Sequence, residues 1–170
     1  MPGKTGEGPD VITYGIANRA DVYAMDISHE DRCSAFTLCT GEGRTSVKLN
    51  TAGRFNIYNA LAAASVCSAL GISLNEIKEG IGSFEGVPMR LEFKEINGAT
   101  VISDVYNANP ASMEEAVKEL LRLRKGRAIA VLGDMLELGA YAEEAHRKLG
   151  RWMAEVPVDI FIAVGRMMAR

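Results

Sequence analysis

The chain has 170 residues and a net charge of −3, with 48% hydrophobic and 24% charged residues. This composition is ordinary for a soluble globular chain, and the length suffices for one ordinary domain or two small ones. The slightly acidic balance argues against a nucleic-acid partner, which requires a basic face. No apolar run approaches the roughly 20 residues of a membrane span, and the N-terminus lacks a signal peptide's apolar core, so we expect a cytoplasmic protein without a membrane span.

The first fifty residues are predicted to form strands. Short apolar or alternating segments, which are typical of β-structure, occupy residues 11–16, 21–28, 33–39 and 45–50. The Gly-containing segment Thr40–Gly43 lies between the last two and is typical of a hairpin turn. At least one antiparallel strand pair is therefore expected.

Two helices are predicted next. Apolar residues recur at helical spacing through residues 55–70, and Gly71 predicts the end of this helix. A second helix is expected over Leu74–Ile81, because Ser73 and Glu76 match the capping-box pattern at its start.

The irregular segment Gly82–Pro88 contains the predicted domain boundary, which divides the chain into residues 1–84 and 85–170. The second part alternates strand, helix, strand, helix, strand, with Ser112 as the expected cap of its first helix. These elements are predicted at residues 100–105, 112–124, 127–132, 143–155 and 158–164. The alternation predicts an α/β domain with parallel strands, in which ligands lie beyond the carboxyl ends of the strands.

Asn56 and Asn59 lie three residues apart near the start of the long predicted helix, so they share one face. Their amides offer donor and acceptor groups that match the edge of adenine. The alternative is a helix cap together with a polar surface residue.

Arg90 and Asp104 flank the first strand after the boundary. An arginine can clamp phosphates with its planar fork, and an aspartate at a strand end can hold ribose hydroxyls. The alternative is a surface ion pair.

The segment VYNANP follows Asp104 directly and contains Tyr106, Asn107 and Asn109. These side chains supply neutral donors and acceptors that suit a zwitterion or a phosphate, at the edge of the sheet where ligands bind. The alternative is an Asn-rich turn that shapes the chain before the next helix.

Three further features are interpreted as structural. Gly3-Lys4-Thr5 looks like the tail of a phosphate-binding loop, but the following GEGPD cannot start the helix that such a loop needs. Asp134 and Glu137 could take part in metal or acid–base chemistry, although capping and solvation are the favoured interpretation. His146 is expected to be a solvated histidine in the middle of a helix.

Several segments together resemble the Mur ligase family. GRFNIYNALAAASVCSALG, at 53–71, is similar to the family's G-x-[HF]-N-x-x-N-A-x-A-A helix, and VPMRLEF, at 87–93, to its arginine segment between the central and C-terminal domains. SDVYNANPASMEEAV, at 103–117, and VLGDMLELG, at 131–139, resemble the branch that adds D-alanyl-D-alanine. The sibling that adds the third stem-peptide residue has a D-Y-A-H-T-P-type loop instead. The resemblance covers nearly all of residues 11–165.

The resemblance implies a three-domain enzyme in which residues 1–84 form the later part of the central ATPase domain and residues 85–170 a Rossmann-like C-terminal domain, truncated at its end. The phosphate loop and the Mg²⁺ ligands would lie outside this chain, so the chain alone is expected to lack ligase activity. In the implied reaction, ATP phosphorylates the terminal carboxylate of UDP-N-acetylmuramoyl-tripeptide. The amine of D-alanyl-D-alanine then attacks the acyl phosphate.

The resemblance also implies a role for each candidate residue. Adenine contacts are implied for Asn56 and Asn59, phosphate or ribose contacts for Arg90, ribose contacts for Asp104, and positions near the γ-phosphate and the incoming amine for Tyr106, Asn107 and Asn109. Position 55 is Phe where many family members have His, so no polar role is expected there. Two alternatives stay open: a folylpolyglutamate synthase-like ligase, whose motifs lack YNANP, and a non-catalytic nucleotide-binding module.

Overall fold

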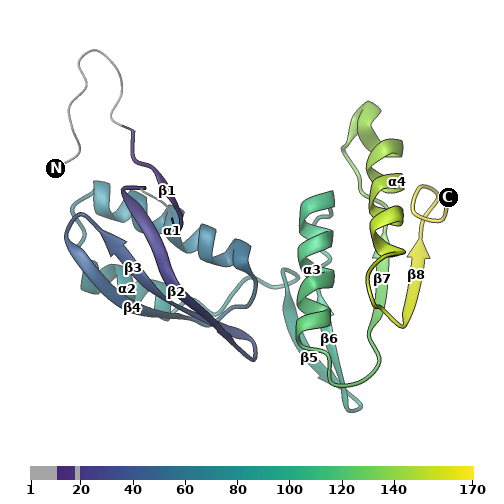
Figure 1. Ribbon diagram of the computed structural model, residues 1–170, viewed down its shortest axis with the longest axis horizontal. Coiled ribbons are helices and arrows are strands. Elements are labelled where there is room, and N and C mark those ends of the chain that lie inside the picture. The colour runs from purple at the N-terminus through teal and green to yellow at the C-terminus, as the bar shows by residue number, and fades with distance from the viewer. Residues whose placement is uncertain (1–10, 18–19) are drawn as a thin grey trace. The chain divides into compact units, whose positions relative to one another are not determined.

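The computed structural model describes residues 11–17 and 20–170, and these residues form two compact units that divide between Gly86 and Val87 (Figure 1). The predicted boundary, between residues 84 and 85, falls inside the first unit. The phosphate-loop-like segment Gly3-Lys4-Thr5 lies outside the described residues. In the part of the chain that is described, no helix is long and apolar enough to cross a membrane.

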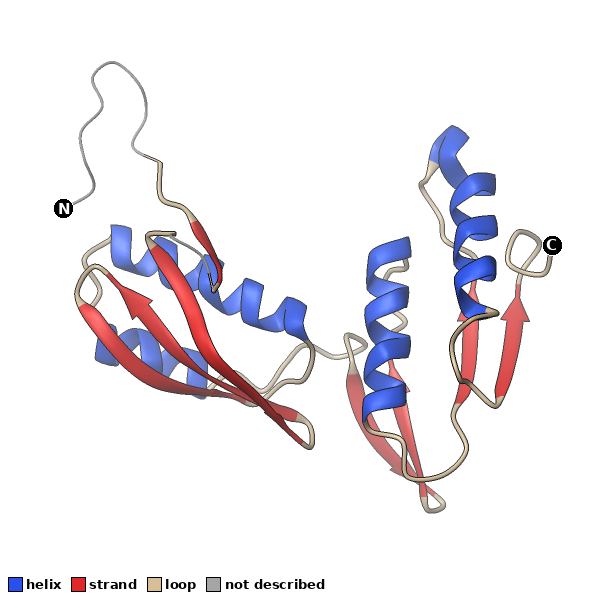
Figure 2. Ribbon diagram, viewed as in Figure 1, coloured by secondary structure: helices blue, strands red, loops and turns tan. Residues whose placement is uncertain are grey.

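The first unit is a four-stranded sheet packed against two helices (Figure 2). The strands lie in the order β1-β2-β3-β4, with β1 parallel to β2 and the other neighbours antiparallel. The predicted hairpin is confirmed, because Thr40 pairs with Gly43 across the β3–β4 turn. The elements are β1 (Tyr14–Ile16), β2 (Val22–Glu30), β3 (Cys33–Thr40), β4 (Gly43–Leu49), α1 (Arg54–Ala69) and α2 (Leu74–Gly82).

The core of this unit follows from the two periodicities of its elements. Every second residue along β3 and β4 faces the helices, including Phe36, Leu38 and Val47, and all three are almost fully buried. The helices contribute residues at helical spacing, such as Ile57 and Leu61. Both predicted helices are confirmed, as is the capping box at the start of α2.

The second unit contains two separate two-stranded sheets and two long helices. A hairpin of β5 and β6 is antiparallel, whereas β7 and β8 are parallel and joined by a helical crossover. The buried faces of the two helices and β7 form its core, around Met113, Val117, Ala130 and Leu149. The elements are β5 (Glu92–Ile96), β6 (Ala99–Ser103), α3 (Pro110–Arg122), β7 (Ile129–Gly133), the short 3₁₀ helix η1 (Gly139–Tyr141), α4 (Ala142–Met153) and β8 (Ile160–Val164).

The expectation of parallel strands throughout this unit is correct for β7 and β8 but wrong for β6. Among the described residues, β6 pairs only with β5, a strand that the sequence analysis did not predict. The reason is the dipeptide Asn97-Gly98, whose φ angles of 49° and 80° make the two-residue turn that suits a tight hairpin. This turn brings β5 alongside β6 and makes the pair antiparallel.

The start of α3 also differs from the expectation. Asn109, and not Ser112, is the cap, and the helix begins at Pro110. The side-chain oxygen of Asn109 accepts the backbone N–H of Ser112 at 2.9 Å, and the Ser112 hydroxyl oxygen accepts the N–H of Asn109 at 3.1 Å. Proline suits the first helical position because its φ is already helical and its missing N–H would have no intrahelical partner.

His146 is buried, with only 5% of its surface exposed, so the expectation of a solvated histidine is wrong. Its Nε2 accepts the backbone N–H of Met135 at 3.0 Å, and Nδ1 lies 2.7 Å from the Ala142 carbonyl oxygen. An amide can only donate, so Nε2 accepts in this contact and Nδ1 is left to donate to the carbonyl. Helical periodicity places residue 146 on the same face as the buried Leu149 and Met153, and the ring ties α4 to the loop after β7.

We predict that His146→Ala lowers the free energy of unfolding by about 2–4 kcal/mol, because it leaves a cavity and an unpaired Met135 amide. The matched control is Arg147→Ala, which removes only an exposed ion pair with Glu143 on the same helix and should change stability by less than about 1 kcal/mol. Urea titration followed by circular dichroism measures both. Equal stability of the two variants would contradict the structural role of His146.

Candidate functional site

The candidate residues of the first unit lie on the first turns of α1. Gly53 precedes this helix with a φ of 90°, and the ring of Phe55 packs so closely over it that a Cβ there would lie 2.7 Å from a ring carbon. Phe55 therefore packs over the backbone at Gly53. No side chain caps this helix start.

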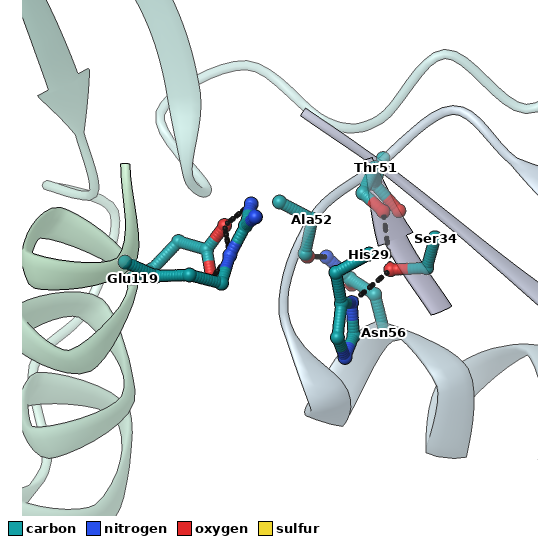
Figure 3. Close-up of polar contacts among 7 residues, drawn as sticks. His29, Ser34, Thr51, Ala52, Asn56 and Glu119 are labelled. Atoms are coloured by element: carbon teal, nitrogen blue, oxygen red, sulfur yellow. Dashed lines mark hydrogen bonds and ion pairs between the residues drawn. The ribbon is translucent and has the colours of Figure 1, made fainter. Parts of the chain in front are cut away.

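Asn56 and Asn59 are joined to each other. The side-chain amide of Asn56 donates to the Ala52 carbonyl at 2.7 Å, and that of Asn59 donates to the Asn56 side-chain oxygen at 3.3 Å. Figure 3 shows Asn56 reaching back to Ala52. The two asparagines share one face, as predicted, and the side chain of Asn56 does not act as a helix cap. Their side-chain amides form a short ladder of hydrogen bonds at the N-terminal end of α1.

A polar chain anchors the segment that leads into α1. The Ser34 hydroxyl, which is almost fully buried in β3, donates to the Thr51 carbonyl at 3.2 Å and lies 3.1 Å from Nδ1 of the exposed His29 (Figure 3). Buried polar groups of this kind fix the backbone to which they are bonded. Ser34 therefore holds Thr51, the residue next to Ala52, whose carbonyl accepts the Asn56 amide.

In the second unit, the segment before β5 is hydrogen-bonded to the segment after β6. The Met89 carbonyl accepts two backbone amides, from Val105 at 2.9 Å and from Tyr106 at 3.2 Å. The Leu91 amide donates to Oδ1 of Asp104 at 3.3 Å. We call residues 87–91 together with residues 104–106 the clasp. The clasp brings the segment around Arg90 next to the segment that contains Asp104 and Tyr106.

Arg90 lies at the centre of the clasp, between two residues with left-handed backbone. The φ angles are 63° at Met89 and 44° at Leu91, a region that non-glycine residues seldom adopt. The Arg90 guanidinium lies over the ring of Tyr106, with its central carbon 4.4 Å from the ring centroid. Such a cation–π contact fixes the direction of the guanidinium and leaves its N–H groups able to donate outward.

Burial raises the pKa of Asp104 above its ordinary value of 3.8, and the Leu91 amide and the charge of Arg90 offset this only in part. The ionised form of this carboxylate is therefore less favourable in the folded protein than in water. Perturbed groups of this kind are common at functional sites, where a ligand supplies the missing partners. The structure thus places Arg90, Asp104 and Tyr106 side by side.

Asn107 and Asn109 follow the clasp, and both are exposed. The Asn107 side-chain oxygen accepts the neighbouring Ala108 amide at 2.9 Å, while Asn109 caps α3. Asn109 therefore has a specific structural role as the cap of α3, beyond the Asn-rich turn expected here. The loop is rigidly held at both ends, by the clasp and by the helix cap.

Asp134, one of the two carboxylates considered for metal or acid–base chemistry, has backbone partners in the structure. Oδ1 of Asp134 accepts the amides of Met168 at 2.8 Å and Met167 at 3.1 Å. These amides, together with that of Arg166, hold the pKa of Asp134 below its ordinary value. Asp134 therefore binds the turn after β8 and does not cap a helix, because the helix starts that follow it, at η1 and α4, have no side-chain cap. In the ranges 11–17 and 20–170, no group of three or more His, Cys, Asp or Glu side chains could hold a metal ion.

Comparison with known proteins defines the class. The model of the Mur ligase middle domain matches residues 3–67, and that of the Mur ligase glutamate ligase domain matches residues 89–170. The two matches occur in this order and fall on opposite sides of the division between the units. The chain belongs to the Mur ligase family.

Within the family, the chain is similar to enzymes of two specificities. It is 36% identical over 151 residues to UDP-N-acetylmuramoyl-tripeptide–D-alanyl-D-alanine ligase of Escherichia coli, covering 88% of this chain and 33% of that protein. It is 39% identical over 124 residues to UDP-N-acetylmuramoyl-L-alanyl-D-glutamate–2,6-diaminopimelate ligase of Geobacillus kaustophilus, covering 72% of this chain and 25% of that protein.

A crystal structure of MurF from Acinetobacter baumannii resembles the chain with a TM-score of 0.85 and 38% identity, over 91% of this chain and 34% of that one. The chain thus spans about a third of the length of the D-alanyl-D-alanine ligases that it matches.

We predict that the stability of the Asp104→Asn variant, compared with that of the parent protein, increases as the pH rises. Because the folded pKa is raised, the folded state binds a proton more tightly than the unfolded state, and parent stability falls as pH rises above the ordinary value of 3.8. The asparagine does not titrate, so the melting temperature of the variant minus that of the parent should increase between about pH 3 and about pH 7.

The control, Glu92→Gln, should show the opposite trend. The Met89 amide, and then Lys94, lower the pKa of Glu92, so its ionised form stabilises the fold and is lost as the pH falls. A melting-temperature difference for Asp104→Asn that decreases with pH would contradict a raised pKa of this carboxylate.

Proposed function

We propose that this chain is part of an ATP-dependent ligase that adds D-alanyl-D-alanine to UDP-N-acetylmuramoyl-tripeptide in cytoplasmic peptidoglycan precursor synthesis. We call the whole enzyme the complete ligase. The observation that carries the proposal is the clasp, which unites Arg90, Asp104 and Tyr106 at the start of the loop that distinguishes the D-alanyl-D-alanine branch. The similarity to the E. coli and A. baumannii enzymes over most of the chain supports it.

We assign ATP contacts to four residues. In the first unit, the amide ladder of Asn56 and Asn59 has the donors and acceptors that adenine requires. In the second unit, Arg90 suits the phosphates or the ribose, because its guanidinium is held in direction by Tyr106. Asp104 suits the ribose hydroxyls, which would supply donors to a carboxylate that burial leaves short of partners.

The proposed reaction begins when the terminal carboxylate of the tripeptide attacks the γ-phosphate of ATP, forming an acyl phosphate and releasing ADP. The amine of D-alanyl-D-alanine then attacks the acyl carbon, and the tetrahedral intermediate collapses to the amide and phosphate. Such transfers need alignment and charge stabilisation more than covalent help from the protein. We assign Tyr106, Asn107 and Asn109 to the region of the γ-phosphate and the incoming amine.

Mg²⁺ is proposed to accompany ATP and to neutralise phosphate charge. The residues described here offer no cluster of three metal-ligating side chains, so none of them is assigned to the ion. The contribution of this chain is the placement of the nucleotide and the amine by neutral amides, one arginine and one carboxylate.

The main alternative is a ligase that adds diaminopimelate, which the 39% identity to the G. kaustophilus enzyme favours. That match covers a smaller part of the chain than the match to the E. coli enzyme. The loop VYNANP differs from the D-Y-A-H-T-P-type loop of the diaminopimelate branch. We therefore prefer D-alanyl-D-alanine as the incoming group.

We predict that the complete ligase releases phosphate from ATP with UDP-N-acetylmuramoyl-tripeptide and D-alanyl-D-alanine, and at least about a hundredfold more slowly with the dipeptide precursor and diaminopimelate. A phosphate-release assay with each precursor and amine pair measures this preference. Faster turnover with diaminopimelate would establish the alternative specificity. Absence of turnover with every pair, despite ATP binding, would favour a non-catalytic nucleotide-binding module.

We predict that Asn107→Ala in the complete ligase lowers kcat at least about tenfold, with little change in the KM for ATP. The expected cause is loss of a group that orients the amine and the acyl phosphate. Steady-state kinetics and a melting curve on the same preparation give both quantities. The matched control is Ser112→Ala, which loosens the cap of α3 and should lower stability while turnover is kept. An Asn107→Ala protein with a lower melting temperature and normal turnover would leave this residue only a role in the turn.

A further inference from the structure

Glu92 has no role in the site as described so far, yet it bonds to the backbone beside Arg90. Its Oε2 accepts the Met89 amide at 3.2 Å and lies 3.2 Å from the Lys94 ammonium nitrogen. On the other side of Arg90, Oδ1 of Asp104 accepts the Leu91 amide. The two left-handed residues that flank Arg90 therefore each donate their amide to a carboxylate.

The left-handed conformation needs such support. A long side chain in this region of backbone space is unfavourable, and it persists only where surrounding contacts impose it. Turning Met89 back to an ordinary conformation would move its carbonyl away from the amides of Val105 and Tyr106, which it now accepts. The Arg90 guanidinium would then lose its place over the Tyr106 ring.

We propose that Glu92 is a positioning residue, which binds the Met89 amide and thereby holds Arg90 in the direction required for ATP. This inference rests on the proposed function, because it presupposes that Arg90 contacts the nucleotide. Glu92 itself touches neither the nucleotide nor the reacting atoms in this account. Its effect is carried by the backbone of Met89 alone.

The test compares ATP dissociation constants by calorimetry on the complete ligase and its variants. Glu92→Ala should weaken ATP binding about fivefold, as expected for the loss of one hydrogen bond. Glu92→Gln loses the charge but keeps an oxygen that can accept the Met89 amide. Because this hydrogen bond is kept, ATP binding should stay within about twofold of the parent. Lys94→Ala removes only the ion pair with Glu92 and should also stay within about twofold.

A second-site variant identifies the backbone as the route. Asparagine adopts the left-handed conformation more readily than methionine. Adding Met89→Asn to Glu92→Ala should therefore restore ATP binding to within about twofold of the parent, although no carboxylate returns. If Glu92 contributes only to general stability, Glu92→Ala lowers the melting temperature and leaves the ATP affinity of the folded protein unchanged. Adding Met89→Asn then brings no specific change in ATP affinity.

Arg90→Ala serves as the reference and separates the two hypotheses. If Arg90→Ala weakens ATP binding and Glu92→Ala does not, the positioning role is overturned and the proposed function stands. If Arg90→Ala leaves ATP binding unchanged, Arg90 does not contact ATP, and both that assignment and the positioning role fail. Equal loss in Glu92→Ala and Glu92→Gln would show that the charge acts directly, which also contradicts positioning through the Met89 amide.

Discussion

The carbonyl of Met89, which accepts the amides of both Val105 and Tyr106, is the interaction on which the site of the second unit depends. It joins the chain entering the β5–β6 hairpin to the chain leaving it. Arg90 and Asp104, separated by an entire hairpin in sequence, therefore become neighbours. The hairpin supplies the closure, since its tight Asn97-Gly98 turn returns the chain to its starting edge. A local turn thus determines which distant residues can act on one ligand.

This arrangement contains features that are unfavourable locally. Two non-glycine residues lie in the left-handed region, and burial disfavours the ionised form of Asp104. Strain and unfavourable burial of charge are kept where surrounding contacts impose them, and they gather at sites that bind ligands. The Asn56–Asn59 ladder of the first unit is different, because its amides are bonded to one another and to Ala52 and carry no comparable strain. Binding of a nucleotide would relieve the cost at Asp104 by adding donors, and would use the orientation that the clasp already gives to Arg90.

The sequence predicted what depends on local chemistry. The capping box at Ser73, the glycine turn between β3 and β4, and the shared face of Asn56 and Asn59 all follow from spacings of a few residues. The β5 strand could have been found from Asn97-Gly98, and the burial of His146 from its helical spacing with Leu149. The clasp could not have been predicted in this way. The left-handed backbone at Met89 and the hydrogen bond that its amide donates to Glu92 depend on tertiary contacts. Neither a methionine nor a glutamate as a residue type indicates such contacts.

We propose above that the clasp binds ATP through Arg90 and Asp104. A crystal structure of the complete ligase with a non-hydrolysable ATP analogue tests this claim most directly. We expect the Arg90 guanidinium to donate to a phosphate or ribose oxygen, Asp104 to accept from a ribose hydroxyl, and Met89 to keep its left-handed conformation. An analogue bound with both side chains beyond hydrogen-bonding distance would contradict the claim and leave the clasp a purely structural feature of the fold.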